Sequence, residues 1–323
     1  MPTTNMRNTF FVTGGCGFIG SHLVDRLIKI GRVIAYDNLS SGKKDYIAAH
    51  LGKNNFRFIK ADLLDKAALQ KSMRGVNIVF HMAANPQIQI GQTSPGVDFQ
   101  QGTVATYNVL EAMRLSGAKK IVFASSSTVF GEPAIRPTPE DYAPLKPISL
   151  YGASKMACEG LVSAYSHMFG MQAWIFRFAN IVGSRGTHGI LVDFLRKLEK
   201  DRRSLEVLGD GRQRKSYLLV EDCVDGMLFA FRHAKDTVNL FNLGTDDDIK
   251  ISEIAKIILK KTGLRNTKIR YTGGRGGWRG DVPLMLLDTK RIKKLGLTVR
   301  YGSRCAIEKA VASLIQEKHG YTN

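Results

Sequence analysis

The stretch Val12–Ile28 reads VTGGCGFIGSHLVDRLI and joins an apolar run to an amphipathic one through four glycines. Gly14, Gly17 and Gly20 follow the spacing G-x-x-G-x-x-G. Glycine loses more backbone entropy on folding than other residues, so the cluster indicates a tight turn or a close backbone approach that side chains would block. The flanking patterns predict a buried strand, then the turn, then a helix whose N-terminus can hold a pyrophosphate.

A second apolar run, VIAYDNLSSG, reaches Asp37 seventeen residues after Gly20. A carboxylate at the end of the second strand accepts hydrogen bonds from an adenosine ribose diol and repels a 2′-phosphate. The glycines alone are also compatible with a strand–helix turn that binds nothing. Together with Asp37 they favour a dinucleotide site, and NAD rather than NADP.

The composition is that of a globular chain of 323 residues, which is long enough for about two domains. No apolar run approaches the roughly 20 residues that span a bilayer, and MPTTNMRNT leads into the first strand without a secretory segment, so we expect a cytoplasmic protein without a membrane partner. The four cysteines are scattered, and neither a metal site nor a disulfide framework is predicted. The net charge of +19 favours anionic partners but is equally compatible with a solvated, lysine-rich surface.

Apolar runs alternate with helical patterns through the N-terminal half of the chain, which is typical of a parallel sheet with crossover helices. The predicted strands are TFFVTG, RVIAYD, FRFIKAD, NIVFHMA, KIVFASS and AWIFRFANIVG. The predicted fold class is α/β, a Rossmann-type doubly wound parallel sheet with a smaller mixed α/β C-terminal region. We expect one domain over residues 1–180, with a return contribution near 217–245, and a second over residues 181–323.

Tyr151 and Lys155 stand four residues apart at the start of a predicted helix and therefore share one face. A free phenol has a pKa of about 10, but a neighbouring ammonium and a cationic nicotinamide both favour the phenolate. A surface tyrosine beside a solvated lysine explains the spacing alone equally well. The fifth predicted strand ends in the hydroxyls of SSST, among them Ser126, at the sheet edge where ligands of open α/β sheets bind.

The motifs TGGCGFIGSHL, YDNLSSG, FHMAA, SSSTVFG, YGASK and RFANIVG occur in this order along the chain. In this respect the sequence resembles the extended short-chain dehydrogenase/reductase family over essentially its whole length. Within that family it is most similar to the NAD-dependent nucleotide-sugar epimerases of the UDP-glucose (UDP-galactose) 4-epimerase type. The two predicted domains would then be an NAD-binding and a nucleotide-sugar-binding domain.

The resemblance implies roles for individual residues. The catalytic groups would be Tyr151 as the base, Lys155 as its electrostatic partner and Ser126 as a hydroxyl donor. NAD would be held by Tyr151 and Lys155 together with Gly14, Gly17, Phe18, Ile19, Gly20, Asp37, Asn38, Asp62, Leu63, Ala83 and Ala84. The substrate would contact Ser126, Tyr151, Asn180, Arg214, Lys215 and Arg279.

The implied reaction interconverts UDP-glucose and UDP-galactose by hydride abstraction at C4, rotation of the 4-keto sugar and hydride return. Alternatives are an epimerase of UDP-GlcNAc or a UDP-uronic acid, and an NAD-dependent sugar dehydrogenase. Related dehydratases carry Asp-Glu after the catalytic hydroxyl, where this chain has Ser127 and Thr128, and these are poor acid–base groups. The family resemblance implies a homodimer through helices containing residues 104–113 and 151–169. GGRGGWRG resembles a short RNA-binding segment, but one copy is thin evidence, and we expect no nucleic-acid partner.

Several positions depart from the family pattern. Gly102 stands where relatives often have an asparagine near the cofactor. Trp278 stands at a usual arginine position, so Arg275 or Arg279 would take over the contact with the diphosphate. Met285 occupies a gate position that is tyrosine in many hexose epimerases and small in those that accept N-acetyl sugars. Arg185 and His188 lie in a loop that could face an acidic sugar, although plain loop positions explain them as well.

Overall fold

The computed structural model describes residues 8–320, with side chains to residue 317. The chain divides into two compact units. The first comprises the described residues up to Ser125, Ala153–Arg177 and Met227–Phe241, and the second comprises Ser126–Gly152, Phe178–Gly226 and the described residues from Asn242 onward. Which ligand each unit holds stays a prediction.

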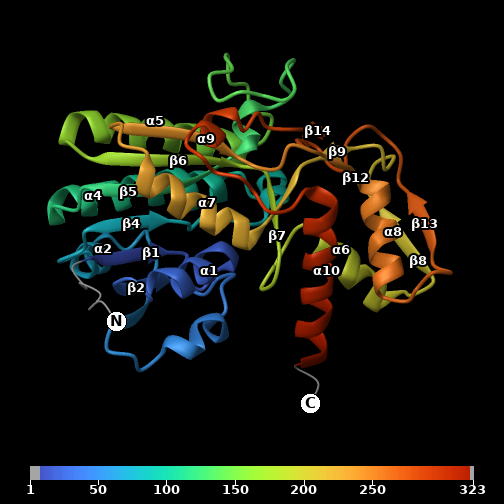
Figure 1. Ribbon diagram of the computed structural model, residues 1–323, viewed down its shortest axis with the longest axis horizontal. Helices are drawn as coiled ribbons and strands as arrows, with labels where there is room; N and C mark the ends of the chain where they lie inside the picture. Colours follow the sequence, from blue (N-terminus) through green and yellow to red (C-terminus); the bar gives the residue numbers. More distant parts are fainter. Residues whose placement is uncertain (1–7, 321–323) are drawn as a thin grey trace. The chain divides into compact units, whose positions relative to one another are not determined.

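A seven-stranded sheet forms the centre of the first unit, in the order β11-β6-β5-β4-β1-β2-β3 (Figure 1). Its strands are β1 (Thr9–Thr13), β2 (Arg32–Asp37), β3 (Phe56–Lys60), β4 (Ile78–His81), β5 (Lys120–Ser126), β6 (Gln172–Phe178) and β11 (Val238–Leu243). Strand β1 pairs in parallel with both β2 and β4, so the direction of winding reverses between β1 and β4. In open α/β sheets a ligand crevice opens at this switch point, outside the carboxyl ends of the strands. The α/β doubly wound fold class predicted from the sequence is therefore confirmed.

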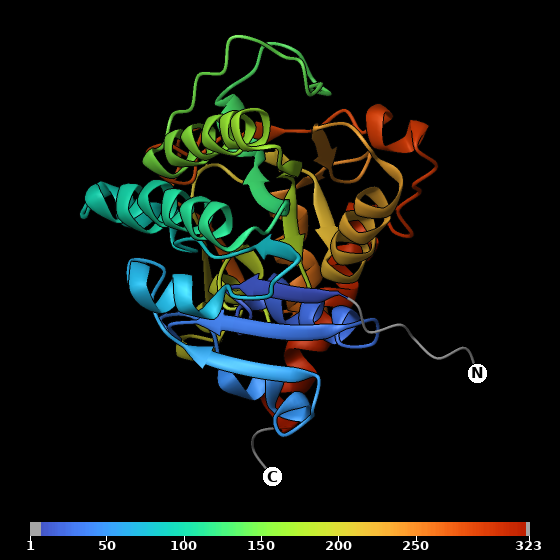
Figure 2. The same ribbon diagram turned by 90° about the vertical axis from the view of Figure 1, so that its left-hand side faces the viewer.

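One face of this sheet is covered by α2 (Lys66–Ser72), α4 (Ala105–Ser116) and α5 (Leu150–Phe169). Figure 2 shows these three helices stacked along the sheet. Their apolar side chains, such as Leu69, Met113 and Val162, join the strands in one buried core cluster. Helix α4 ends at Gly117, whose φ of +79° is the left-handed conformation that glycine adopts most readily at a helix C-terminus.

The opposite face carries α1 (Phe18–Leu27) and part of α7 (Val220–His233). Leu23 and Leu27 of α1 are fully buried. A chain of aromatic contacts crosses this face: Phe231 of α7 lies 5.8 Å from Phe80 and 4.7 Å from Trp174, measured between ring centroids. Rings at these distances pack as offset or edge-on pairs and contribute beyond their buried area.

The apolar run at residues 173–183, predicted as one strand, is two strands in two sheets. Strand β6 ends at Phe178, and β7 (Asn180–Val182) pairs in parallel with β10 (Tyr217–Leu219). The chain changes partners at Ala179, whose N–H donates to Leu243 O at 2.9 Å, whereas the N–H of Asn180 donates to Ser216 O at 3.2 Å.

The second unit contains several small sheets, and three of its helices bury a common apolar cluster. Besides β7 and β10, its strands are β8 (Ser204–Val207), β9 (Arg214–Lys215), β12 (Ile249–Lys250), β13 (Lys268–Tyr271) and β14 (Leu284–Met285). Helices α6 (Ile190–Lys200), α8 (Ile251–Lys261) and α10 (Ser303–Gly320) bury one apolar cluster that includes Leu195, Ile254 and Ile307. Within the described residues, no helix is long and apolar enough to cross a membrane.

Candidate active site

The glycine turn between β1 and α1 packs so tightly against neighbouring backbone that its glycines have no room for a side chain. Gly14 has φ +65°, and a Cβ there would lie 2.9 Å from the backbone nitrogen of Ala83, at the end of the neighbouring strand β4. A Cβ at Gly20 would overlap the carbonyl oxygen of Gly14, and one at Gly15 would lie 2.8 Å from the Ala35 methyl group. The backbone of the turn therefore packs directly against Ala35 of β2 and against Ala83, which follows β4.

Gly17 is the N-cap residue of α1, and no side chain caps this helix. The N–H groups of its first turn, at Phe18 and Ile19, point out of the helix end, as in every α-helix. The helix dipole adds partial positive charge at the same place. An uncapped helix N-terminus after a glycine-rich turn, whose one side chain, Cys16, is buried, fits a pyrophosphate, so the residues present match the dinucleotide predicted for them.

The predicted adenosine residues come together at the carboxyl ends of β2 and β3. Asp37 is 8% exposed, and its carboxylate accepts hydrogen bonds from the N–H groups of Cys16 at 3.0 Å and Leu39 at 2.8 Å. Burial raises the pKa of Asp37, and these two hydrogen bonds act against that rise. Asn38 Nδ2 donates to Asp62 Oδ2 at 2.8 Å, which fixes the position of the Asp62 carboxylate. Leu63 follows Asp62 directly and is buried.

Ala83 and Ala84 follow β4 on the other side of the glycine turn. The N–H of Ala83 donates to Thr13 Oγ1 at 3.2 Å. His81, at the end of the same strand, is bonded at both ring nitrogens, to Thr13 Oγ1 at 2.7 Å and to Thr106 Oγ1 at 3.0 Å. Burial, assisted by the charge of Lys155, lowers the pKa of His81 to about 3. This histidine is therefore a neutral structural link below the glycine turn.

The hydroxyl-bearing end of β5 packs against the first turn of α5. Ser126 is the last residue of β5, and its Oγ accepts from Thr128 N at 3.2 Å and from Thr128 Oγ1 at 3.0 Å. A Cβ at Gly152 would lie 2.7 Å from Thr128 O, so the residue next to Tyr151 must be small for this contact. The structure thereby brings the Ser126–Thr128 turn and the start of α5 together.

Tyr151 and Lys155 lie one turn apart on α5, as their spacing predicts. Lys155 is 4% exposed, and its Nζ donates to Ala124 O at 2.6 Å and lies 4.9 Å from the centroid of the Phe123 ring. Burial lowers the pKa of Lys155 to about 8, although the charges of Cys158, Glu159 and Asp98 oppose this. A desolvated ammonium interacts more strongly with a nearby phenolate than a solvated one does.

One further group, which the sequence reasoning missed, supports this helix. Glu159 stands four residues after Lys155 and is 8% exposed. Its carboxylate accepts from Ser125 Oγ at 2.5 Å and from Arg177 Nη2 at 2.7 Å and Nε at 3.0 Å. Strands β5 and β6 are thus both tied to α5 directly behind Lys155. The one available signal was a glutamate at the i+4 position of the lysine, on the same helix face.

The structure explains why position 102 is a glycine. It lies in the π-helical turn Phe99–Val104 that precedes α4, and a Cβ there would overlap Ser154 Oγ. That hydroxyl donates to Asp98 O at 2.8 Å and is hydrogen-bonded to Thr103 Oγ1 at 3.0 Å. Ser154 therefore fills the space that a side chain at position 102 would need.

The predicted substrate residues lie in the second unit, where two of their cations, Arg214 and Lys215, have carboxylate partners. Asn180 Nδ2 donates to Ser216 O at 3.1 Å, so it lies beside the segment that carries Arg214 and Lys215. Lys215 forms an ion pair with Asp281, and Arg214 pairs with Asp248 at 2.5 Å. An anionic ligand would have to compete with these carboxylates for the two cations.

The arginine-bearing loop after β13 closes on Asp281. The N–H of Gly277 donates to Asp281 Oδ2 at 2.9 Å, and the N–H of Asp281 donates to Trp278 O at 3.1 Å. Arg275 pairs with Glu132 at 2.7 Å. Arg279 follows Trp278 in the same turn, and Met285, at the predicted gate position, is 9% exposed. Within residues 8–317, no group of three or more His, Cys, Asp or Glu side chains could hold a metal ion.

A glycine-rich turn at the switch point of a doubly wound sheet, with carboxylates at the ends of β2 and β3, defines a dinucleotide-binding α/β enzyme. Residues 10–244 match the model of the NAD dependent epimerase/dehydratase family. The chain belongs to this family, and NAD is its cofactor, as the sequence predicts.

Individual relatives are similar over nearly the whole chain. A Methanocaldococcus jannaschii protein provisionally named UDP-glucose 4-epimerase is 35% identical over 292 residues, covering 88% of this chain and 91% of its own. A crystal structure of a UDP-galactose 4-epimerase is 39% identical with a TM-score of 0.85, covering 96% of this chain and 99% of its own. The Thermotoga maritima UDP-glucose 4-epimerase, solved with UDP-glucose, is 29% identical with a TM-score of 0.86 and covers 96% and 99% of the two chains.

Proposed function

We propose that the enzyme interconverts UDP-glucose and UDP-galactose by epimerisation at C4 of the sugar. The observation that carries this proposal is the first part of α5, which presents Tyr151 one turn before a buried Lys155 and packs its Gly152 against the hydroxyl-bearing end of β5. The names of the UDP-glucose and UDP-galactose 4-epimerases that it resembles support the choice of substrate.

In this proposal each group has one task. Tyr151, as phenolate, removes the proton of the C4 hydroxyl, holds it, and returns it to the C4 oxygen after the sugar has turned over. Lys155 stabilises the phenolate through its charge. Ser126 donates a hydrogen bond to the C4 oxygen. When bound, NAD supplies reversible hydride exchange with a carbinol carbon. Phe18 and Ile19 would bind its pyrophosphate through their N–H groups, and Asp37 would hold its adenosine ribose.

The residues after Ser126 favour epimerisation over elimination. A dehydratase needs an acid and a base to remove water across C5 and C6, and the positions available for them carry Ser127 and Thr128. Aliphatic hydroxyls do not titrate near pH 7 and are inefficient general acids or bases. Asn180, Arg214, Lys215 and Arg279 would contact the nucleotide diphosphate and sugar, with Lys215 exchanging Asp281 for a phosphate.

The experiment that tests the proposal is incubation of the purified enzyme with UDP-glucose, UDP-galactose, UDP-GlcNAc and UDP-glucuronic acid, with the isomers resolved by chromatography. We expect the two UDP-hexoses to equilibrate without lasting absorbance at 340 nm. A stoichiometric rise at 340 nm would instead identify a sugar dehydrogenase, and turnover of UDP-GlcNAc or UDP-glucuronic acid alone would identify another epimerase.

The matched variant is Tyr151→Phe, which removes only the phenolic oxygen. We expect it to lose at least about 10²-fold in kcat, the lower end of what a positioned general base contributes, while retaining NAD. The control is Tyr271→Phe, on an exposed tyrosine of β13, which should keep full activity. Unchanged turnover in Tyr151→Phe would refute the assigned base.

We also propose that the enzyme is a homodimer and works in the cytoplasm. Helices α4 and α5 expose apolar side chains, with Tyr107 at 40%, Leu115 at 53% and Met168 at 74%, and a second copy is the occupant that the family resemblance implies. All four cysteines are free, which suits a reducing compartment. Light scattering should give a dimer mass for the wild type and for Ile30→Lys, at an exposed position elsewhere. A dimer that persists in Leu115→Lys/Met168→Lys would refute this surface.

A further inference from the structure

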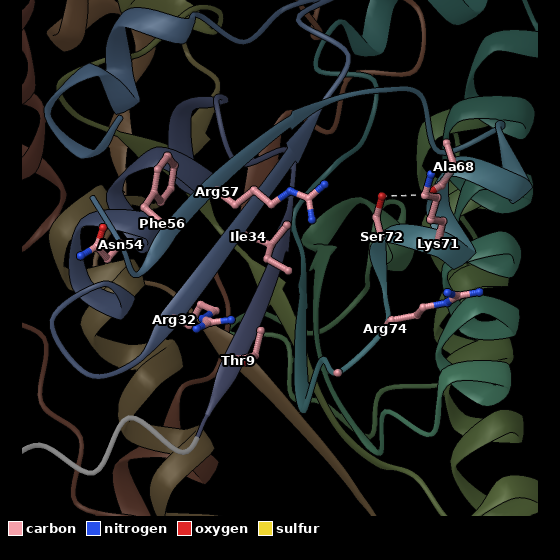
Figure 3. A pocket seen from close by; sticks show the side chains of 11 residues that line it. Thr9, Arg32, Ile34, Asn54, Phe56, Arg57, Ala68, Lys71, Ser72 and Arg74 are labelled. Carbon is pink, nitrogen blue, oxygen red and sulfur yellow. Dashed lines mark hydrogen bonds between the residues drawn. The ribbon is translucent and has the colours of Figure 1, made fainter. Parts of the chain in front are cut away.

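A hollow of about 840 Å³ lies between the amino ends of β1–β3 and the C-terminal end of α2, within the first unit (Figure 3). Ile34, which is 7% exposed, contributes its apolar side chain, and Arg32, Arg57, Lys71 and Arg74 contribute charge. The volume lies in the range of small-molecule sites, which is roughly 300–1,000 Å³.

The four cations come from different elements that meet around this space. Arg57 stands opposite Ile34 in the β2–β3 register, and Arg32 lies two residues before Ile34, so alternation puts all three on the sheet face that α2 covers. Lys71 and Arg74 belong to the last turn of α2 and the residues after it. Figure 3 shows Arg57 reaching from β3 toward α2.

No acidic side chain of residues 8–317 forms an ion pair with these four cations. Among the residues that line the hollow, none is acidic. All four cationic residues are exposed, and over residues 8–317 none of their side chains donates a hydrogen bond or forms an ion pair. The C-terminal end of α2 supplies about half a negative charge at most, against four positive charges. A bound anion would therefore reduce the electrostatic repulsion among these four cationic side chains.

The hollow is distinct from the cofactor crevice. Thr9 and Arg32 are the first residues of β1 and β2, whereas the glycine turn and Asp37 lie at the other ends of the same strands. Strands of five and six residues at about 3.3 Å per residue separate the two edges by about 16–20 Å. A ligand in the hollow would not overlap a dinucleotide at the opposite edge.

We propose that this hollow binds a small phosphate compound with at least three negative charges. Guanidinium groups match phosphate oxygens in a bidentate geometry, and two or more arginines on one phosphate chain give charge-assisted hydrogen bonds. The four cations line one hollow that also contains the apolar side chain of Ile34, which suits a compact ligand. An extended polyanion would need basic side chains aligned along a continuous groove.

The test is isothermal titration of the NAD-loaded enzyme with inorganic tripolyphosphate at two salt concentrations. We expect one saturable site, with an affinity that falls as salt rises because phosphate contacts displace counterions. Arg57→Gln/Lys71→Gln should weaken the affinity at least about tenfold, and its NAD content and epimerase activity should equal those of the wild type. Because binding is measured as heat, the result does not depend on which sugar the enzyme turns over.

The matched control is Lys256→Gln/Arg265→Gln, which removes one lysine and one arginine from exposed positions of the second unit. Equal weakening in both double variants would show that only net charge matters, and would overturn the site. So would competition between tripolyphosphate and a UDP-sugar. A titration with UTP in the presence of saturating UDP-glucose, which occupies the proposed substrate site, separates the possible sources: tighter binding than tripolyphosphate indicates a nucleotide, and equal binding indicates the phosphate chain alone. Tighter binding of a single-stranded oligonucleotide would overturn the proposal.

Discussion

Glu159 and Arg177 form a buried ion pair, in which Arg177 Nη2 lies 2.7 Å and Nε 3.0 Å from the two oxygens of one carboxylate. Their side chains are 10% and 4% exposed. Ser125 Oγ donates to the same carboxylate at 2.5 Å. The pair joins α5 to β5 and β6 one turn beyond Lys155, so the position of that lysine depends on it.

We predict that Glu159→Gln destabilises the protein, because it leaves the Arg177 charge buried without a partner. Breaking one side of a buried pair costs about 3–5 kcal/mol. The measurement is the free energy of unfolding in urea. As a control, Glu253→Gln removes the partner of Arg304 from a pair whose side chains are 57% and 35% exposed, and should cost less than about 1 kcal/mol. Similar losses in the two variants would contradict the structural role of Glu159.

The titration of Lys155 should affect activity and stability in opposite directions. Burial lowers the pKa of Lys155 to about 8 from the ordinary value of 10.5. Above that pH the ammonium is lost and no longer supports the phenolate, so kcat should fall with an apparent pKa near 8. Between about 8 and 10.5 the unfolded chain retains a proton that the folded protein has released, so this group alone makes stability rise with pH. The comparison is with Lys155→Met, whose unfolding free energy should lack that rise.

Acid should destabilise the fold through His81. Its pKa of about 3 in the folded protein lies below the ordinary value of 6.5, because the ring is buried. As the pH falls below about 6.5 the unfolded chain gains a proton that the folded protein refuses, so stability is lost progressively down to about pH 3. Between pH 6.5 and 5 this loss is about 2 kcal/mol at most. The pH dependence of urea unfolding in His81→Gln should lack this contribution, and an unchanged slope would contradict the assignment.

Two glycine-to-alanine substitutions should change the stability of the protein in opposite directions. Gly20→Ala puts a methyl group onto the Gly14 carbonyl, so the turn must open, and we expect loss of bound NAD together with a lower melting temperature. Gly160→Ala adds a methyl group inside α5, where nothing lies within 4 Å, and should stabilise the protein by up to about 1 kcal/mol. NAD retained at full stoichiometry in Gly20→Ala would show that the close approach is dispensable.

Local patterns sufficed to predict the first five strands, because each apolar run is short and is bounded by turn or polar residues. The same patterns could not divide the run at residues 173–183, since apolar residues occur on both sides of Ala179. The break arises from a change of backbone partner, from Leu243 to Ser216, and both partners lie far along the chain. A single sequence contains no local signal for such a change.

Motif spacing likewise predicts groups that lie close in the chain and misses those that only the fold brings together. Tyr151 and Lys155 are recognisable because one helical turn separates them. Arg177 stands within an apolar strand, and nothing near it in the sequence indicates that its charge is neutralised by Glu159. The pairing of Lys215 with Asp281 was missed for the same reason, since 66 residues separate the two.

The contact between Gly102 and Ser154 couples two positions that are far apart in the sequence. An engineer who wished to install an asparagine at position 102 would have to replace Ser154 by glycine in the same step. The asparagine alone would clash with Ser154, and the glycine at position 154 alone would leave a cavity beside Gly102. Divergence at these two sites is thus expected to proceed in concert, and a library that randomises them jointly should recover functional combinations that stepwise screening would discard.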